Sequence, residues 1–402
     1  MEAAEQFAPV FYQDVADGAW NDPELRRRDL LAAVNYDGNW DPTDNAENLD
    51  DHLLPGIVYY DAVETETSWF LLYSLYHPLD WNSAGWIDHE SDMEHVWLYV
   101  EKEVDGGLTL RALHTQAHGE TFAWTDLAGG FPVEGVTIDA EGERPRIFVE
   151  AHGHGPASCA HGGGLPFTEA IDCDPDDDDD MVIYRVDGPP GEPDVSGGGV
   201  VEAGYTLVYG YHALWPYRAD ATLWNELYSY EPGRNTDGDW YNDLAIVADL
   251  GLEFDGDEGG GGGLPPWAYE IDDDYHGGVV WGARGDWLVD PAALFATMYR
   301  DYSCSDRDAF WNYLDNPYLL DLGGPAAGTD GGHRCDGWVV RPDSGWTDTA
   351  TPGPTDSDAP ADSAAAASDE PGKAVQPEGC GCATPSAAAL PVASIGLVCL
   401  HA

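Results

Sequence analysis

The sequence predicts a mainly β protein with a β-sandwich core and peripheral helices, and three observations lead to this fold class. Aromatic residues make up 12% of the 402 residues, and Trp and Tyr each outnumber Phe, so the chain can bury a large core. Residues 67–81, TSWFLLYSLYHPLDW, carry apolar side chains on both faces of a strand, which is typical of a strand covered on both sides. Similar short segments recur along the chain, separated by turns rich in Gly and Asp.

The strand pattern continues after residue 81. Residues 95–116, HVWLYVEKEVDGGLTLRALHTQ, predict two strands joined by a hairpin turn at Asp105-Gly106-Gly107. Further strands are expected within residues 144–153, 181–186 and 205–214, RPRIFVEAHG, MVIYRV and YTLVYGYHAL.

Helices are expected in three places. Residues 22–34, DPELRRRDLLAAV, have a helical pattern in which Asp22 can cap the first turn and Pro23 can occupy it. Two later segments, residues 290–302 and 306–314, show a similar period.

The composition limits the partners of this protein. The formal net charge is −59, and the only lysines are Lys102 and Lys373, so the surface carries many carboxylates. Such a surface repels nucleic acid, which we exclude as a partner, and it attracts divalent cations. It suits an extracellular or salty setting.

The chain divides by composition into three parts. Residues 1–346 form the predicted folded β-rich domain, and residues 347–378, rich in Pro, Ser, Ala and Asp, predict a disordered linker. Residues 379–402 hold a Gly-Cys-Gly-Cys motif, with Cys380 and Cys382, followed by a short apolar tail. That tail is shorter than the roughly 20 residues that a membrane-spanning helix needs.

The order of linker, cysteine motif and apolar tail resembles the C-terminal sorting signal of myxobacterial surface proteins, in a truncated form without the arginine cluster. An ordinary flexible tail is the alternative. The N-terminal residues show no basic region followed by an apolar one, so either the protein is cytoplasmic or its true start lies upstream. We expect a secreted or cell-surface protein, with membrane or cell-surface association through the tail.

Cysteine spacing suggests disulfides in an oxidising compartment. Of the seven cysteines, Cys159 with Cys173 and Cys304 with Cys335 are the candidate pairs. The sequence leaves the connectivity open.

One stretch of the sequence predicts a metal site. His89, Asp92 and Glu94 lie within six residues just before and at the start of a predicted strand, and Asp80 lies in the loop after the preceding strand, which is expected to end near Tyr76. This loop returns the chain to the edge of the sheet, so Asp80 can approach the other three. Asp92 and Glu94 are two residues apart, so they point the same way from an extended chain. One imidazole with several carboxylates suits Ca²⁺, Mg²⁺ or Mn²⁺ better than a structural Zn²⁺ site. The alternative is that a chain this acidic places carboxylates near a histidine by chance.

The same stretch carries a family resemblance. Residues 88–102, DHESDMEHVWLYVEK, follow an aromatic strand and precede LHTQAHG at residues 113–119. This arrangement resembles the Gly-His-Arg-His-Asp-Trp-Glu signature of the necrosis- and ethylene-inducing-like proteins. It is also similar to the His-Glu-Gly-Asp-Trp-Glu segment of the vacuolar protein sorting-associated protein 62 family. His89, Asp92 and Glu94 fall on the first His, the Asp and the Glu of these patterns.

The resemblance covers about residues 55–160 and implies both a fold and a function. Asp80 lies about as far before His89 as another metal-binding Asp does in the necrosis-inducing family. Two positions depart from the pattern, because Ser91 replaces the second His or Gly and Met93 replaces the Trp. The resemblance implies a β-sandwich with a divalent cation at one end, where the cation takes part in recognising sugar headgroups of membrane lipids.

Four further histidines are candidates for a second shell of the metal site or for acid and base roles. His114 and His118 lie in LHTQAHGE, and His152 and His154 lie in EAHGHGPASC, at predicted strand ends beside Gly. The alternative is that these histidines make ordinary hydrogen bonds in loops.

The Asp-rich segment at residues 235–243, NTDGDWYND, is a candidate calcium loop. Its ligands would be Asp237, Asp239 and Asp243, since a hard cation takes several oxygens from a flexible turn. A solvated acidic loop is the alternative, because the spacing is not that of an EF-hand.

Three functions are compatible with these features. The leading hypothesis is an exported, surface-associated protein whose divalent cation helps to bind a glycan or a lipid headgroup, with Trp and Tyr as stacking faces. The second is a metal-dependent hydrolase in which His152 or His154 moves protons, and the third is an acidic structural surface protein without a metal. Since no P-loop, nucleophile elbow or dinucleotide fingerprint is found, we expect a binding protein more than an enzyme.

Overall fold

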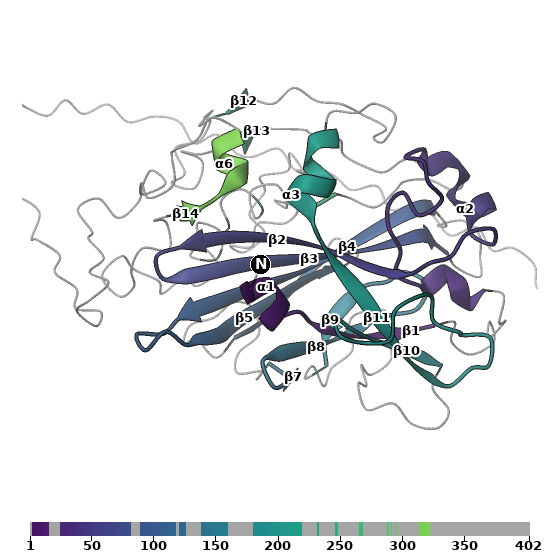
Figure 1. Ribbon diagram of the computed structural model, residues 1–402, viewed down its shortest axis with the longest axis horizontal. Helices are drawn as coiled ribbons and strands as arrows, with labels where there is room; N and C mark the ends of the chain where they lie inside the picture. Colours follow the sequence, from purple (N-terminus) through teal and green to yellow (C-terminus); the bar gives the residue numbers. More distant parts are fainter. Residues whose placement is uncertain are drawn as a thin grey trace, which may run out of the picture. The chain divides into compact units, whose positions relative to one another are not determined.

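The protein is described by a computed structural model (Figure 1). The described residues are 2–15, 25–81, 89–117, 120–125, 138–159, 180–218, 231–232, 246–247, 265–267, 313–321 and the single positions 288, 291 and 295. The chain divides into one compact unit, Met1–Gly353, which holds every described residue, and a second unit, Pro354–Ala402.

Twelve strands form one sheet. They are β1 (Val10–Asp14), β2 (Gly56–Thr65), β3 (Ser68–Asp80), β4 (His89–Lys102), β5 (Leu108–Ala117), β6 (Glu120–Thr125), β7 (Ala140–Glu141), β8 (Arg144–Val149), β9 (Pro156–Ser158), β10 (Met181–Arg185), β11 (Val200–Tyr209) and β14 (Tyr313–Asp315). A separate two-stranded pair is formed by β12 (Glu231–Pro232) and β13 (Ile246–Val247).

The described helices are short. They are α1 (Glu2–Gln6), the 3₁₀ helices η2 (Arg26–Asp29) and η3 (Pro42–Asp44), α2 (Asn45–Asn48), α3 (Gly210–Ala213), the 3₁₀ helix η4 (Trp215–Tyr217) and α6 (Pro317–Asp321). The mainly β class predicted from the sequence is therefore confirmed.

The sheet contains both parallel and antiparallel pairs, and it curves so that β9, at one end of the strand order, contacts β4 and β5 near the other end. Strands β2 to β6 form an antiparallel series, and the order then continues from β2 through β11, β10, β1 and β8 to β7. The β2–β11, β11–β10 and β1–β8 pairs are parallel, and β10–β1 is antiparallel. Because β9 pairs with β8 and also lies against β4 and β5, the two halves of the order face each other. The expected sandwich is thus built from one continuous sheet.

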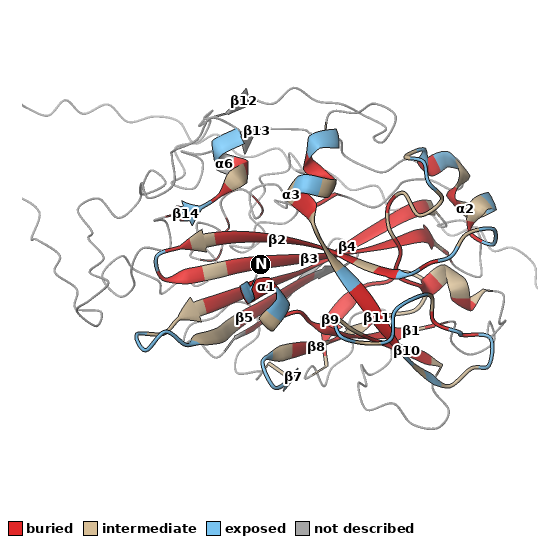
Figure 2. Cartoon of the chain, viewed as in Figure 1, coloured by how far each residue is buried: buried red, intermediate tan, exposed pale blue. Residues whose placement is uncertain are grey.

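Strand β3 is buried along most of its length. Every residue from Phe70 to Leu79 is buried, as the apolar side chains on both of its faces predicted (Figure 2). Its Tyr73 hydroxyl donates to the Ala4 carbonyl oxygen at 2.8 Å, which holds the N-terminal α1 segment against the sheet.

The predicted hairpin between β4 and β5 is present. Gly106 has φ +88°, a conformation that favours glycine, and its N–H donates to the Glu103 carbonyl at 2.9 Å. The Asp105 side chain accepts from the Gly107 N–H at 3.0 Å, as an Asp at such a turn is expected to do.

The helix expected at residues 22–34 is not found in its described part. Only Arg26–Asp29 is helical, as one turn of 3₁₀ helix, and Leu30 is already extended with ψ 139°. The Ala32 N–H then donates to the Tyr76 carbonyl of β3 at 2.9 Å, so pairing with a buried strand replaces the helical hydrogen bond.

The other two helix predictions lie mostly outside the described residues. The last residues of the segment at 306–314, Tyr313 and Leu314, belong to β14, which pairs with β2. The predicted linker and tail, with Cys380 and Cys382, also lie outside the described residues. Among the helices that the structure describes, none has the length and apolar character needed to span a bilayer.

Candidate metal centre

The pairing of β3 with β4 creates the centre. His77 on β3 lies opposite Asp92 on β4 in the antiparallel register, and Asp80 lies opposite His89 three positions further along. Residues directly opposite on neighbouring strands have adjacent side chains on one face of the sheet. The register therefore brings a histidine from the apolar strand, His77, next to the predicted ligand Asp92.

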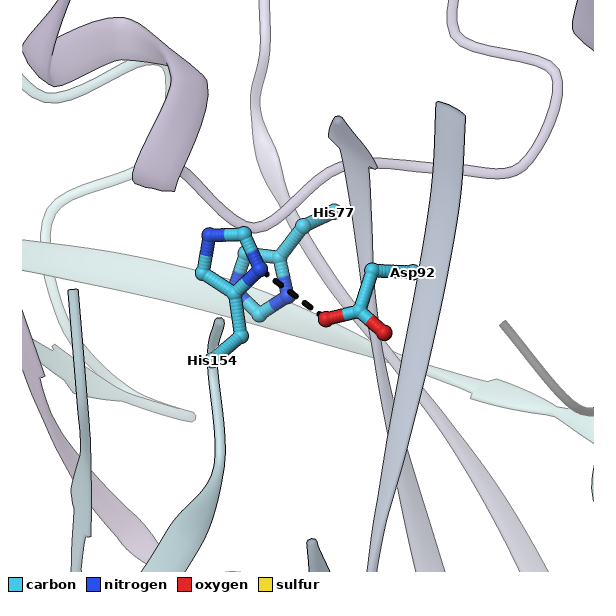
Figure 3. A group of neighbouring side chains, drawn as sticks. All are labelled: His77, Asp92 and His154. Carbon is cyan, nitrogen blue, oxygen red and sulfur yellow. Dashed lines mark hydrogen bonds and ion pairs between the residues drawn. The ribbon is translucent and has the colours of Figure 1, made fainter. Parts of the chain in front are cut away.

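A third side chain arrives from the other half of the sheet. His154 lies between β8 and β9, and its Nδ1 is 3.0 Å from Oδ2 of Asp92. One ring nitrogen of His77, one of His154 and a carboxylate oxygen of Asp92 all lie within 4.8 Å of one another (Figure 3). His77 and His154 have no exposed side-chain surface and Asp92 is 4% exposed, so water is largely excluded from this group.

The backbone around the centre is strained at three residues. Ser91 of β4 has φ 60°, and His152 and His154 have φ 72° and 52°. A non-glycine residue with positive φ costs on the order of 1–3 kcal/mol and persists only where its surroundings hold it. The Ser91 conformation is stabilised by hydrogen bonds of its hydroxyl to the Tyr76 hydroxyl and the Asn45 amide, each at 2.9 Å.

A second buried carboxylate supports His154. Asp29 of η2 has no exposed surface, and its Oδ1 lies 3.2 Å from Nε2 of His154. The same oxygen accepts from the Trp81 indole N–H at 3.0 Å and from the His152 backbone N–H at 2.8 Å. These bonds fix the His154 ring between two carboxylates, one on each of its nitrogens.

The hydrogen bonds of Gln13 fix the state of His77. The amide nitrogen of Gln13 donates to the backbone oxygens of Asp14 and Glu150, at 3.0 and 3.2 Å. Its amide oxygen therefore faces Nε2 of His77 at 3.0 Å and must accept a hydrogen bond from an N–H there. A neutral His77 that donates from Nε2 carries a lone pair on Nδ1.

The electrostatics of the two histidines differ. Burial by itself would lower the pKa of His154. Its hydrogen bonds to Asp29 and Asp92 outweigh this effect and raise the pKa to about 10. Burial, and then the neighbouring positive His154, hold the pKa of His77 well below its ordinary value. The two rings stack with centroids 3.7 Å apart and planes at 8°. Without a cation, a neutral His77 therefore lies against a protonated His154.

The other predicted ligands lie close by on the same two strands. Nε2 of His89 is 3.5 Å from Oδ2 of Asp80, and both side chains are partly exposed. Glu94 lies two residues beyond Asp92 on β4, opposite Leu75, and is buried. Among the described residues, the one group of three acidic or histidine side chains with this close spacing is His77, Asp92 and His154. The four-residue ligand set stays a prediction.

Two of the other histidines are described in detail. His152 packs its ring against Trp81, with centroids 4.1 Å apart. Both residues also bond to Asp29, Trp81 through its indole and His152 through its backbone N–H. His114 is buried on β5, opposite Trp97 of β4, and burial holds its pKa well below the ordinary value. His118 lies outside the described residues.

The remaining predicted sites lie largely beyond the described part of the chain. Asp237, Asp239 and Asp243 are outside it, so the calcium loop is untested. Cys159 follows β9 and is half-buried, and its predicted partner is outside the described residues, as are the cysteines of the second pair, Cys304 and Cys335.

Three residues of the centre were missed in the sequence. His77 is a histidine within a strand of mostly apolar residues, and this unusual setting is the local signal that could have identified it. Asp29 lies in a segment with a helical pattern, and Gln13 lies in the N-terminal strand. Asp29 meets His154 across 125 residues, which no local spacing indicates.

Parts of the chain are similar in structure to several solved proteins. No family model and no curated protein sequence matches the chain. Necrosis and ethylene inducing protein 2, from the causal agent of witches' broom disease of cocoa, is 21% identical with a TM-score of 0.21. The match covers 28% of this chain and 49% of that one, so this chain spans about half the length of that protein.

Two further structures are of NLPPya bound to amino sugars. NLPPya in complex with glucosamine is 19% identical with a TM-score of 0.26, and the match covers 41% of this chain and 70% of that one. NLPPya in complex with mannosamine is 18% identical with a TM-score of 0.25 over 41% and 68% of the two chains. The similarity to the vacuolar protein sorting-associated protein 62 family and the C-terminal sorting signal stay predictions.

Proposed function

We propose that this protein is an exported, surface-associated binding protein that holds a divalent cation at Asp92 and uses it to bind a polar ligand such as a glycan or lipid headgroup. The observation that carries the proposal is the buried group of His77, Asp92 and His154, whose potential ligand atoms lie within 4.8 Å of one another.

The charge of the centre favours a cation. Asp29 and Asp92 are both buried, and a buried carboxylate is costly unless it is paired. Among the charged groups that the hydrogen bonds bring together here, His154 supplies one positive charge against two carboxylates. A divalent cation that replaces the Nδ1 proton of His154 would balance both carboxylates. Asp80, His89 and Glu94 lie on the same two strands, β3 and β4.

A partly exposed aromatic pair is available to a sugar. Trp40 stacks on Tyr217 with ring centroids 4.6 Å apart, and Tyr217 is 38% exposed. Trp40 precedes η3 and α2, whose Asn45 bonds to Ser91 of β4. Exposed aromatic faces suit sugar rings, since they combine an apolar surface with hydrogen-bonding groups. The ligand class also follows the resemblance of the segment at residues 88–102 to the necrosis-inducing family.

A titration on the EDTA-treated protein tests the proposal. In a buffer with enough salt to screen surface carboxylates, Ca²⁺, Mg²⁺, Mn²⁺ and Zn²⁺ are added in turn to the wild type and to Asp92→Asn. We expect one cation per chain to bind the wild type, and a cation at 100 times its dissociation constant to stabilise the fold by about 2.7 kcal/mol. Asp92→Asn should lose both effects.

The matched control is Asp51→Asn, which removes an exposed carboxylate that is not part of the group of His77, Asp92 and His154. It should bind like the wild type. Equal binding and equal stabilisation in Asp92→Asn and the wild type would show that Asp92 holds no cation. If the cation binds, a glycan and lipid-headgroup array with and without EDTA then tests the ligand.

A further inference from the structure

We propose that the cation of this centre is a nitrogen-preferring transition-metal ion such as Zn²⁺ or Co²⁺, bound by Nδ1 of His77, Nδ1 of His154 and the carboxylate of Asp92. This inference rests on the proposed function, since it names the class of cation that the same centre takes. It departs from the Ca²⁺, Mg²⁺ or Mn²⁺ that the sequence pattern favours.

The first support is the state of His77. Gln13 accepts a hydrogen bond from Nε2–H of His77, so the lone pair of this ring is on Nδ1. Among the described residues this Nδ1 has no hydrogen-bond partner, and His77 has no exposed surface. A buried acceptor left without a donor destabilises the fold by about 1–3 kcal/mol, so a ligand for this nitrogen is expected. A protonated His154 beside Asp92 does not supply one, because both of its protons face carboxylates.

The second support is the setting of His154. Asp29 lies at Nε2 and so directs Nδ1 of the same ring toward Asp92. A histidine that ligates a metal commonly donates its other N–H to a carboxylate or carbonyl in this way, which fixes the ring and its tautomer. Gln13 does the same for His77, so both rings have an oriented and supported Nδ1.

The third support is the spacing. Two ligands that each lie about 2.1 Å from one metal ion are about 3 Å or somewhat more apart. Nδ1 of His154 and Oδ2 of Asp92 are 3.0 Å apart, so an ion in place of the shared proton fits this pair. The rings of His77 and His154 lie side by side, with centroids 3.7 Å apart and planes at 8° (Figure 3). Because the lone pair of an imidazole nitrogen lies in the plane of its ring, the His77 ring must tilt from this stack for its Nδ1 to reach the same ion.

The donor set decides the class of ion. Two imidazoles and one carboxylate suit Zn²⁺ and the later first-row metals. Ca²⁺ takes six to eight oxygens and Mg²⁺ a near-octahedral set of oxygens. The group of His77, Asp92 and His154 contributes oxygen from one residue only.

Co²⁺ titration of the full chain, freed of metal by a chelator, tests the inference. Co²⁺ bound to nitrogen and oxygen ligands of the protein absorbs in the visible region, and Zn²⁺ should displace it whereas a large excess of Ca²⁺ should not. His77→Phe keeps a flat ring without the donor and should weaken Co²⁺ binding by more than the roughly 10–100-fold expected when a supporting partner is lost. Gln13→Leu removes only the supporting hydrogen bond and should weaken it by about 10–100-fold. His212→Gln, at an exposed histidine, is the control and should bind like the wild type.

The outcomes separate this inference from the function on which it rests. Binding of Ca²⁺ or Mg²⁺ that depends on Asp92, without binding of Co²⁺ or Zn²⁺, would overturn the inference and leave the proposed function standing. Absence of binding by every cation would overturn both. If His77→Phe does not fold, X-ray absorption at the zinc edge of the wild type replaces it, and two imidazole ligands are expected. One imidazole or none would overturn the inference.

Discussion

Asp29 is the residue on which the order of the centre depends most. One of its carboxylate oxygens accepts from the Trp81 indole, the His152 backbone and the His154 ring, and the side chain is fully buried. These bonds link η2, the end of β3 and the segment between β8 and β9. They also hold His152 and His154, whose φ values of 72° and 52° are costly for residues with a side chain.

Replacing Asp29 should therefore destabilise the fold. We expect Asp29→Ala to lower the free energy of unfolding by about 3–5 kcal/mol, since it leaves a buried positive His154 with one carboxylate and removes the acceptor for two N–H groups. Asp29→Asn should cost less, because an amide oxygen can still accept from Trp81 and His152. Urea unfolding gives both values, with Asp51→Ala as an exposed control; an Asp29→Ala value within about 0.5 kcal/mol of wild type would refute the role.

At the level of secondary-structure elements, a buried carboxylate joins α6 to the sheet. Asp61 of β2 accepts from the Tyr318 hydroxyl of α6 and from the Tyr211 backbone N–H of α3, at 2.9 Å for the latter. Burial raises the pKa of Asp61 to about 7, although both hydrogen bonds lower it. The nearby aromatic residues Tyr60 and Tyr209 stack on each other with centroids 5.2 Å apart.

Asp61 should make stability depend on pH. Its pKa is about 7 in the folded state and near 3.8 when unfolded, so the folded state binds the proton more tightly between these values. The contribution of Asp61 to stability is then full below about pH 4 and is lost as the pH rises to 7, by about 4 kcal/mol at most. Asp61→Asn should remove this slope.

The measurement is the free energy of unfolding from pH 4 to pH 7 for the wild type, Asp61→Asn and the exposed control Asp51→Asn. The difference between the wild type and Asp61→Asn should move in favour of Asp61→Asn as the pH rises. A difference that is constant over this range would contradict the assignment, whatever slope the many other carboxylates give to all three proteins.

The elements themselves show what local sequence can and cannot predict. The buried strand at residues 67–81 and the hairpin at residues 105–107 were predictable, because alternation and turn residues are local signals. The helix expected at residues 22–34 was wrong in its described part, because burial of Leu30, Leu31 and Ala32 against β3 outweighs the helical pattern.

At the scale of the whole molecule, the centre is a product of how the sheet closes. Asp92 was predicted from its spacing on β4, and His154 from its place near a strand end. Their meeting across 62 residues, and that of His154 with Asp29 across 125, require β8 and β9 to return to β4. Local spacing cannot indicate such contacts, so His77, Asp29 and Gln13 were not predicted.

The net charge of −59 also acts at this scale. A surface with so many carboxylates binds divalent cations loosely at many points, so binding alone does not locate a cation. The proposed cation occupies one buried position, so a test must identify that position.

Anomalous X-ray scattering from crystals of the full chain grown with Zn²⁺, or soaked in it, tests this claim most directly. We expect one strong anomalous peak, within about 2.0–2.2 Å of a carboxylate oxygen of Asp92 and of nitrogens of His77 and His154. Anomalous peaks confined to exposed carboxylates, with Asp92 and His154 still hydrogen-bonded to each other, would contradict it.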